Sequence, residues 1–142
     1  VYGGEKGSPE KGNFVLNVIK EAGDRESVEV GSEQTVSPTF AGDLSVGTLK
    51  LLKSEIEPGV YHLVNEGSCS WAEFAVEIFK LAKINKEVRP KDRGSINGLM
   101  KRPRFSALQN LKAKASGVEL PSWQIGLKSY FEFFNKKNES QN

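Results

Sequence analysis

Apolar side chains recur at helical spacing in five stretches of the chain. In the first, residues 14–22, the positions Val15, Val18, Ile19 and Ala22 share one helical face. The later stretches with this spacing are 41–53, 71–82, 110–116 and 121–134. The pattern predicts five helices that each turn one face toward a core. Within 41–53, we expect Leu44, Thr48, Leu51 and Leu52 to point inward.

Two of these helices carry N-terminal signals. Ser70-Trp71-Ala72-Glu73 fits a capping box, in which the Ser hydroxyl and the Glu carboxylate satisfy the first amides of a helix. Asn13 stands where the first helix needs an N-cap, and Gly23 follows that helix as a stop signal.

Shorter stretches have the pattern of strands. Residues 27–30 alternate, with Val28 and Val30 on one side, and residues 87–90 form a short extended segment. Residues 60–64, Val-Tyr-His-Leu-Val, are the strongest strand prediction, because a nearly continuous apolar run is typical of a strand covered on both faces in a parallel sheet. Residues 31–38 predict an irregular connector. Helices that alternate with short strands indicate an α/β fold.

The composition excludes several classes of protein. The 142 residues, 37% of them hydrophobic, suffice for one core, and no run approaches the roughly 20 apolar residues of a membrane-spanning helix. The single cysteine excludes an internal disulfide and favours a reducing compartment, so we expect a cytoplasmic protein. The chain begins at Val1 and its only methionine is Met100, which leads us to expect a processed product or a fragment.

The net charge of +2 conceals an uneven distribution. Residues 1–75 hold 6 Lys and Arg against 12 Asp and Glu, whereas residues 76–142 hold 14 against 6. The basic part contains Lys101-Arg102-Pro103-Arg104, which either clamps a diphosphate through its guanidinium groups or is a solvated loop. Aromatic residues are not interleaved with these charges, so we expect no nucleic-acid partner.

No complete nucleotide-binding motif is present. The segment 42–48, Gly-Asp-Leu-Ser-Val-Gly-Thr, has the glycine spacing of a phosphate-binding loop but lacks its lysine, and close packing of a helix explains these glycines better. Tyr2 and Lys6 match the Tyr-x-x-x-Lys pair of some dehydrogenases. That pair requires both side chains on one helical face, and the intervening Gly3 and Gly4 oppose a helix, so we interpret the match as chance.

His62 and Cys69 are the only histidine and the only cysteine, and they do not have the spacing of metal ligands. In an apolar strand, His62 is more often a structural residue than a catalyst. Cys69 precedes the capped helix, whose dipole could lower the pKa of the thiol. A Cys–His hydrolase is therefore a weak alternative, and a buried, idle thiol is favoured.

Five motifs occur in the order found in one known family. They are Tyr2-Gly3 with Gly12-Asn13-Phe14-Val15, Ser37-Pro38-Thr39-Phe40 with Asp43-Leu44, Gly59-Val60-Tyr61-His62 with Asn65 and Gly67, Ser70-Trp71 with Phe74-Ala75, and Arg102-Pro103 with Ser106, Leu108 and Leu120-Pro121-x-Trp123. Through them the chain, from residue 1 to about residue 134, resembles the C-terminal half of the dTDP-4-dehydrorhamnose reductases, extended short-chain dehydrogenase/reductases of rhamnose biosynthesis.

The resemblance implies the C-terminal substrate-binding lobe of such an enzyme, together with a fragment of its Rossmann sheet. Residues 1–134 would form the substrate-binding region, residues 60–64 the sheet fragment, and residues 135–142 a polar tail. The family's nucleotide-binding fingerprint and catalytic Tyr-x-x-x-Lys would lie upstream, so we expect no catalytic residue in this chain and no activity of the chain alone. Exposed strand edges would cause self-association or homo-oligomer formation.

The resemblance also implies roles for single residues. Tyr2 and Gly3 would line the nicotinamide end of NADP(H) in an intact enzyme. Asn13 would lie near the diphosphate of a dTDP-sugar substrate, Arg102 would be the main diphosphate contact, and Arg104 a weaker one. The Ser37-Pro38-Thr39 loop would chiefly fix the entry to the second helix.

Two functional interpretations stay open. In the first, the chain belongs to an NADPH-dependent reductase that reduces the 4-keto group of a dTDP-sugar. In the second, it is a non-catalytic binding or regulatory module with a reductase-like fold. The coding sequence upstream of Val1 discriminates between them, since catalysis needs the glycine fingerprint and the Tyr-x-x-x-Lys pair.

Overall fold

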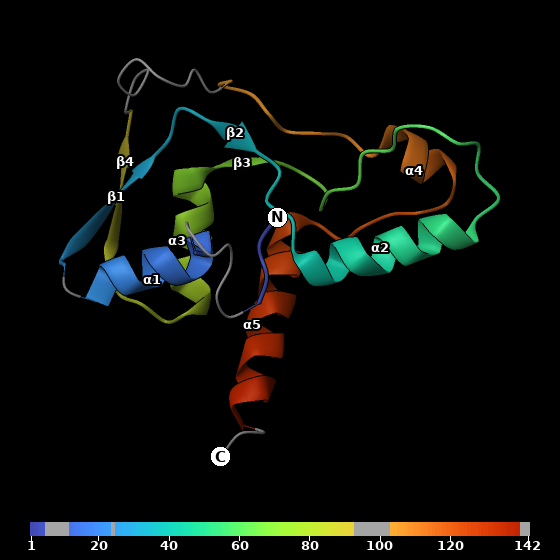
Figure 1. Cartoon of the computed structure of the whole chain (residues 1–142). Coiled ribbons are helices and arrows are strands. Elements are labelled where there is room, and N and C mark those ends of the chain that lie inside the picture. Colours follow the sequence, from blue (N-terminus) through green and yellow to red (C-terminus); the bar gives the residue numbers. More distant parts are fainter. Residues whose placement is uncertain (5–11, 24, 93–102, 140–142) are drawn as a thin grey trace. The chain divides into compact units, whose positions relative to one another are not determined.

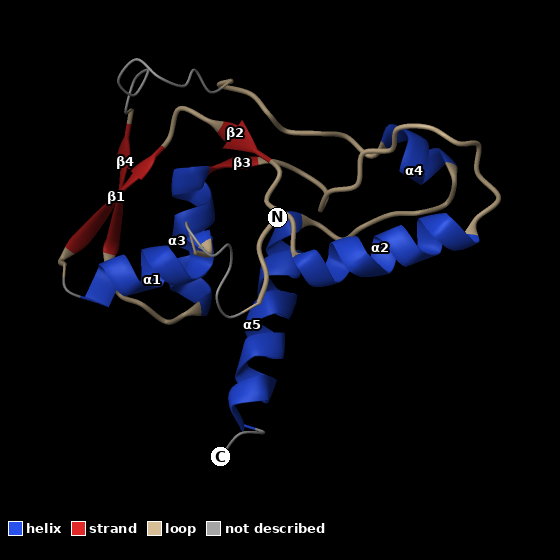
Figure 2. Cartoon of the chain, viewed as in Figure 1, coloured by secondary structure: helices blue, strands red, loops and turns tan. Residues whose placement is uncertain are grey.

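All five predicted helices occur in the computed structural model of the chain, which describes residues 1–4, 12–23, 25–92 and 103–139 (Figures 1 and 2). The helices are α1 (Phe14–Gly23), α2 (Ala41–Lys53), α3 (Trp71–Leu81), α4 (Leu111–Ala115) and α5 (Trp123–Glu139). The strands are β1 (Ser27–Gly31), β2 (Thr35–Val36), β3 (Cys69–Ser70) and β4 (Glu87–Lys91). The predicted mixed α/β character is confirmed.

The chain divides into two compact units. The helical unit comprises Val1–Gly3, Ser37–Gly67 and Leu108–Asn142, and thus contains α2, α4 and α5. The sheet unit comprises Gly4–Val36 and Ser68–Ala107, and contains α1, α3 and all four strands. The single region predicted for residues 1–134 therefore consists of two units that interleave along the sequence.

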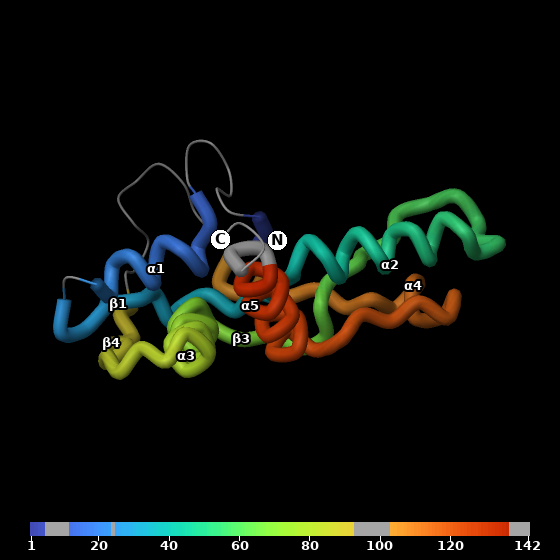
Figure 3. Tube along the Cα trace, turned by 90° about the horizontal axis from the view of Figure 1, so that it is seen from below, coloured from blue at the N-terminus to red at the C-terminus, as the bar shows by residue number. Residues whose placement is uncertain are grey.

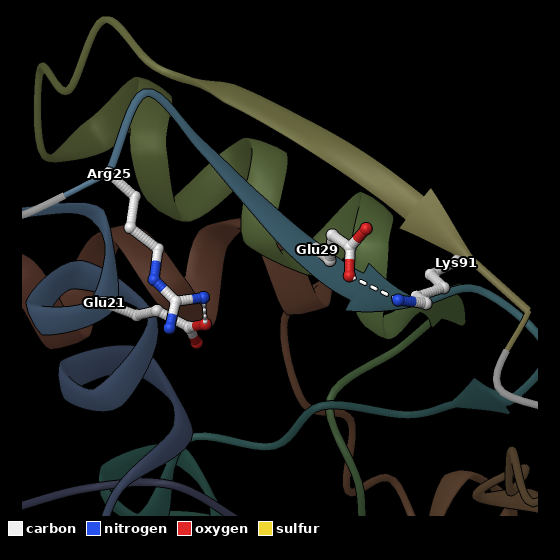
Figure 4. A network of polar contacts seen from close by, with 4 residues as sticks. All are labelled: Glu21, Arg25, Glu29 and Lys91. Atoms are coloured by element: carbon white, nitrogen blue, oxygen red, sulfur yellow. Dashed lines mark hydrogen bonds and ion pairs between the residues drawn. The ribbon is translucent and has the colours of Figure 1, made fainter.

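In the sheet unit, β1 and β4 form a two-stranded parallel sheet, with Ser27 opposite Glu87 and Gly31 opposite Lys91. Val28 and Val30 point to the buried face, as predicted, and both α1 and α3 pack against β1. Glu29 points to the exposed face, where its carboxylate accepts a hydrogen bond of 2.5 Å from the Lys91 ammonium (Figure 4). The sheet therefore has one apolar face and one charged face.

Helix α3 contributes more buried apolar residues to the described sheet unit than any other element. Its Phe74, Ala75 and Ile78 are fully buried. The ring of Phe14, at the start of α1, lies 4.6 Å from that of Trp71 and 5.7 Å from that of Phe74, measured between centroids. The spacing of apolar residues in 71–82 thus predicted both the helix and its inner face.

The connector predicted to be irregular contains a short strand. β2 pairs antiparallel with β3, with Thr35 opposite Ser70 and Val36 opposite Cys69. On its other side, Thr35 forms a parallel bridge with Phe105. Two-residue strands have no detectable alternation, which is why the sequence pattern did not predict them.

In the helical unit, α2 packs against the segment that carries α4, and the two run side by side in both views (Figures 1 and 3). The core between them consists of Leu51, Ala113, Val118 and Leu120. A Cβ at Gly47 would lie 2.6 Å from Cδ1 of Leu120, so the predicted close packing of a helix glycine is confirmed there.

Two of the inward positions predicted for α2 are wrong. Leu52 is 74% exposed and Thr48 is exposed as well, whereas Gly47 and Leu51 are buried. The exposed Val46 and Leu49 share the outer side of the helix with Leu52. Because α2 carries apolar side chains on both sides, the apolar pattern alone did not identify the buried one.

The strongest strand prediction is also wrong. Residues 60–64 have no strand partner in the described part of the chain, and Val60 and His62 are exposed. Instead, the Val64 N–H donates to Oδ1 of Asn110 over 2.8 Å, and Nδ2 of Asn110 donates to the Val64 carbonyl over 2.7 Å. An amide side chain thus makes the two bonds that a neighbouring strand would make.

Helix α5 extends into the segment predicted to be a polar tail. It continues through Glu139, although residues 135–139 are polar. Its predicted apolar stripe is largely confirmed, since Trp123, Leu127 and Tyr130 are buried.

Candidate functional site

Tyr2 and Gly3 form a short main-chain bridge to the start of α2. The Tyr2 N–H donates to the Thr39 carbonyl, and the Ala41 N–H donates to the Tyr2 carbonyl, each over 2.8 Å. The Tyr2 ring is buried, with its centroid 6.0 Å from that of Phe40 and 5.6 Å from that of Tyr130. Tyr2 lies outside any helix, in agreement with the interpretation of the Tyr-x-x-x-Lys match as chance; Lys6 lies outside the described residues.

Gly3 has a packing role of its own. A Cβ at this position would lie 2.8 Å from Cβ of Ala41, so the chain can approach α2 this closely only with glycine. Packing in the helical unit accounts for both residues, and their contact with a nicotinamide stays a prediction.

Asn65 is a buried centre of hydrogen bonds that the sequence reasoning missed. Its Oδ1 accepts from the Phe40 N–H over 2.8 Å, and its Nδ2 donates to the Asp43 carboxylate over 2.8 Å and to the Pro121 carbonyl over 3.0 Å. Its own N–H donates to the Thr39 hydroxyl over 3.2 Å. Asn65 thereby holds the loop before α2, which supports the structural role predicted for that loop. An amide directly after an apolar run is the signal that could have indicated it.

Asn13 occupies the N-cap position of α1, as predicted. Its side-chain Oδ1 accepts from the Val15 N–H over 2.9 Å, and Asn13 is buried. Gly23, predicted as a stop after this helix, is its last residue. The arrangement places the first-turn amides and the positive end of the helix dipole beside Asn13. This geometry is compatible with a nearby anion, and the diphosphate contact stays a prediction.

Arg104 lies in the sheet unit beside β2. Its carbonyl accepts a hydrogen bond of 2.7 Å from the Thr35 N–H, and its side chain is exposed. Arg102, the main predicted diphosphate contact, lies outside the described residues. Asn13 and Arg104 therefore belong to the same compact unit, whereas Tyr2 and Gly3 belong to the other.

Cys69 differs from the expectation for a thiol before a helix. Burial, with a smaller contribution from the negative charge of Glu73, raises the pKa of the Cys69 thiol to about 12. The suggestion that the helix dipole lowers it is wrong, chiefly because the thiol is buried, and also because the capping box places the Glu73 carboxylate at this helix start. The Ser70 N–H and hydroxyl donate to that carboxylate over 2.6 and 2.9 Å, which lowers the Glu73 pKa. The burial predicted for this thiol is confirmed.

Within the described residues, no group of three or more His, Cys, Asp or Glu side chains is arranged to hold a metal ion. None of the helices described has the length and apolar character needed to cross a bilayer.

Comparison with known proteins places the chain in a family. The family model described as the RmlD substrate binding domain matches residues 1–135, which is nearly the whole chain. The chain belongs to this family.

Curated relatives agree with this assignment. The chain is 32% identical over 125 residues to a protein of Streptomyces griseus named dTDP-4-dehydrorhamnose reductase, covering 84% of this chain and 41% of that protein. It is 30% identical over 120 residues to the Spore coat polysaccharide biosynthesis protein SpsK of Bacillus subtilis, covering 84% of this chain and 42% of the relative.

Solved structures share the fold. A dTDP-4-dehydrorhamnose reductase from Bacillus anthracis, crystallised in complex with NADP, superposes with a TM-score of 0.80 at 35% identity and covers 92% of this chain. An orthologue from Clostridium acetobutylicum gives the same TM-score at 31% identity and covers 89%. The expected α/β fold is thus shared with solved dTDP-4-dehydrorhamnose reductases, in agreement with the match to the RmlD substrate binding domain. The chain spans less than half the length of these relatives.

Proposed function

We propose that this RmlD substrate-binding domain binds the dTDP-sugar substrate of an NADPH-dependent dTDP-4-dehydrorhamnose reductase. The match of the family model to residues 1–135 carries the proposal. The names of the curated and crystallised relatives support the choice of reaction. In such an enzyme, NADPH supplies the hydride that reduces the 4-keto group.

The sheet unit provides the proposed diphosphate contacts. Arg104 is exposed on a main chain that is fixed to β2, and Arg102 is two residues upstream. Guanidinium groups bind diphosphate oxygens through paired, charge-assisted hydrogen bonds. Asn13 adds the amide-rich start of α1, where the helix dipole favours negative charge. The work of these residues is to bind and orient the substrate.

The helical unit provides the proposed contacts to the nicotinamide end of the cofactor. Tyr2 and Gly3 are held at the start of α2 by two main-chain hydrogen bonds. Because the Tyr2 ring is buried against Phe40 and Tyr130, we assign the proposed contact with the nicotinamide to the main chain at Tyr2 and Gly3. Neither residue moves a proton, and the chain alone is expected to be inactive.

Calorimetric titration of the chain with dTDP-rhamnose tests the substrate site. We expect binding that Arg102→Ala weakens about tenfold and Arg104→Ala weakens less, because each loses charge-assisted hydrogen bonds. Arg89→Ala is the matched control, since Arg89 is an exposed arginine of the same unit that pairs with Glu87. Absence of binding to the unaltered chain, or equal affinities of all variants, would contradict the proposed site.

The apolar outer side of α2 supports the proposal that the isolated chain self-associates. Val46, Leu49 and Leu52 are exposed there, and Val60 is exposed in the neighbouring sequence. Exposed apolar patches of this kind favour association with another surface. Sedimentation should show a dimer or larger species that Leu52→Lys shifts toward monomer. A clean monomer at high concentration would contradict the proposal.

We also propose a cytoplasmic location, because a single cysteine is typical of proteins from a reducing compartment.

A further inference from the structure

The chain passes between its two compact units at four points, all of them within the described residues. These points follow Gly3, Val36, Gly67 and Ala107. Several links between two units allow rotation only if they lie close to one axis, because displacement grows with distance from the axis. A hinge then needs only a few residues at the ends of elements to change their backbone torsions.

The hydroxyl group of Ser37 joins two of the other crossing points to its own. It donates to the Gly67 carbonyl and accepts from the Leu108 N–H, each over 3.2 Å. At three of the four points, the helical unit begins or ends at one of these residues, Ser37, Gly67 and Leu108. One side-chain oxygen thus lies within hydrogen-bond distance of three linking segments.

The fourth linking segment is bound to the same short loop. The Tyr2 N–H donates to the Thr39 carbonyl over 2.8 Å, and the Thr39 hydroxyl donates to the Ser37 carbonyl over 3.1 Å. Pro38 is buried between these two residues, and its ring fixes φ, so the loop is stiff. All four linking segments therefore meet at residues 37–39 of the helical unit.

We propose that residues 37–39 form a pivot on which the sheet unit turns relative to the helical unit, and that the Ser37 hydroxyl holds the linking segments together there. The pivot leaves the core of each unit undisturbed, because the torsions that change lie at the ends of elements. The inference concerns the free chain and does not depend on the proposed function.

Amide hydrogen exchange of the 142-residue chain tests the role of Ser37. We expect Ser37→Ala to speed exchange at Leu108 about tenfold, the equivalent of one lost hydrogen bond. The amide of Ile78, in the buried part of α3, should exchange at an unchanged rate. Ser37→Thr keeps a hydroxyl and should restore the protection of Leu108. Ser45→Ala is the matched control, because the Ser45 hydroxyl donates to a carbonyl within α2.

Residual dipolar couplings of the backbone amides test the pivot itself. If the sheet unit turns on residues 37–39, the two units align to different degrees in a dilute liquid crystal. We expect their couplings to require alignment tensors of different magnitude in the unaltered chain. Ser37→Ala should enlarge that difference, because the linking segments separate, whereas Ser45→Ala should leave it unchanged.

Three other outcomes would overturn the inference. Unchanged exchange at Leu108 in Ser37→Ala would show that the hydroxyl does not hold the linking segments. Faster exchange throughout both units, Ile78 included, would show that Ser37 only stabilises the fold. One alignment tensor that fits both units of the unaltered chain would show that they are joined rigidly. No ligand enters these measurements, so the proposed function stands or falls separately.

Discussion

The two compact units provide hydrogen-bond partners for their main-chain N–H and C=O groups in different ways. In the sheet unit, β1 pairs with β4, β2 pairs with β3, and α1 and α3 cover the apolar face with regularly spaced side chains. In the helical unit, the main chain at Phe40 and Val64 is held by the side-chain amides of Asn65 and Asn110. The longer helices and strands of the sheet unit leave a periodic signal in the sequence, whereas two-residue strands and single buried amides do not. The difference predicts which changes each unit tolerates.

Phe74→Ala should have the largest effect on stability. The side chain is fully buried in the sheet unit, so its removal leaves a cavity and should cost about 3–5 kcal/mol of the free energy of unfolding. Urea unfolding measures this loss. Val76→Ala, on the exposed side of the same helix, should cost far less. Equal losses for the two variants would show that the sheet unit does not depend on its apolar core.

Asn65→Ala tests the dependence of the helical unit on a buried amide. The substitution leaves the Phe40 N–H and the Pro121 carbonyl without their partner and should cost about 2–3 kcal/mol. Asn135→Ala, an exposed asparagine of α5, should be neutral in the same unfolding experiment. A neutral Asn65→Ala would remove the contrast between the units.

Gly47→Ala sharpens the comparison for helix packing. Alanine normally stabilises a helix relative to glycine. Here the new Cβ would lie 2.6 Å from Leu120 and 3.0 Å from Leu63, so we expect a net loss of about 1–2 kcal/mol. At Gly23, the last residue of α1, nothing lies within 4 Å of such a Cβ, and alanine should be neutral or slightly stabilising in thermal melts. If alanine stabilised the chain at both glycines, the close packing of Gly47 against Leu120 and Leu63 would be disproved.

Ser70→Ala should have the smallest effect, about 1 kcal/mol, because it removes the capping box of α3. The pKa of Glu73 is lowered in the folded chain, so this contribution is complete above the ordinary carboxyl pKa and disappears as the pH falls through the lowered value. The difference in melting temperature between the unaltered chain and Ser70→Ala should therefore shrink in acid. Ser45→Ala, on the exposed side of α2, controls for the loss of a hydroxyl. A difference that grows in acid would contradict the assignment.

The contrast between the units also explains what the sequence could predict. The five helices, the capping box at Ser70 and the strand 27–30 follow from local periodicity and were predicted correctly. The strand at 60–64 was wrong because an apolar run indicates burial but not a partner, and the pairing groups come from Asn110, 46 residues further along the chain. The inner side of α2 was mistaken because Leu52 is as apolar as Leu51.

The candidate site was predicted to a smaller extent. Asn13 was correctly identified as a helix cap, and Arg104 lies exposed in the same unit. The bridge between Thr35 and Phe105 joins residues 70 positions apart in sequence, so no local pattern could indicate it. The ligand contacts of Asn13, Arg102, Arg104, Tyr2 and Gly3 remain predictions.

Amide chemical-shift mapping during titration with dTDP-rhamnose tests the proposed substrate role most directly. It should show shifts in the sheet unit, at the first turn of α1 and at residues 103–106, while the amides of Asn65 and Asn110 in the helical unit stay unchanged. The absence of shifts, or shifts confined to the helical unit, would contradict the proposal that the sheet unit binds the sugar nucleotide.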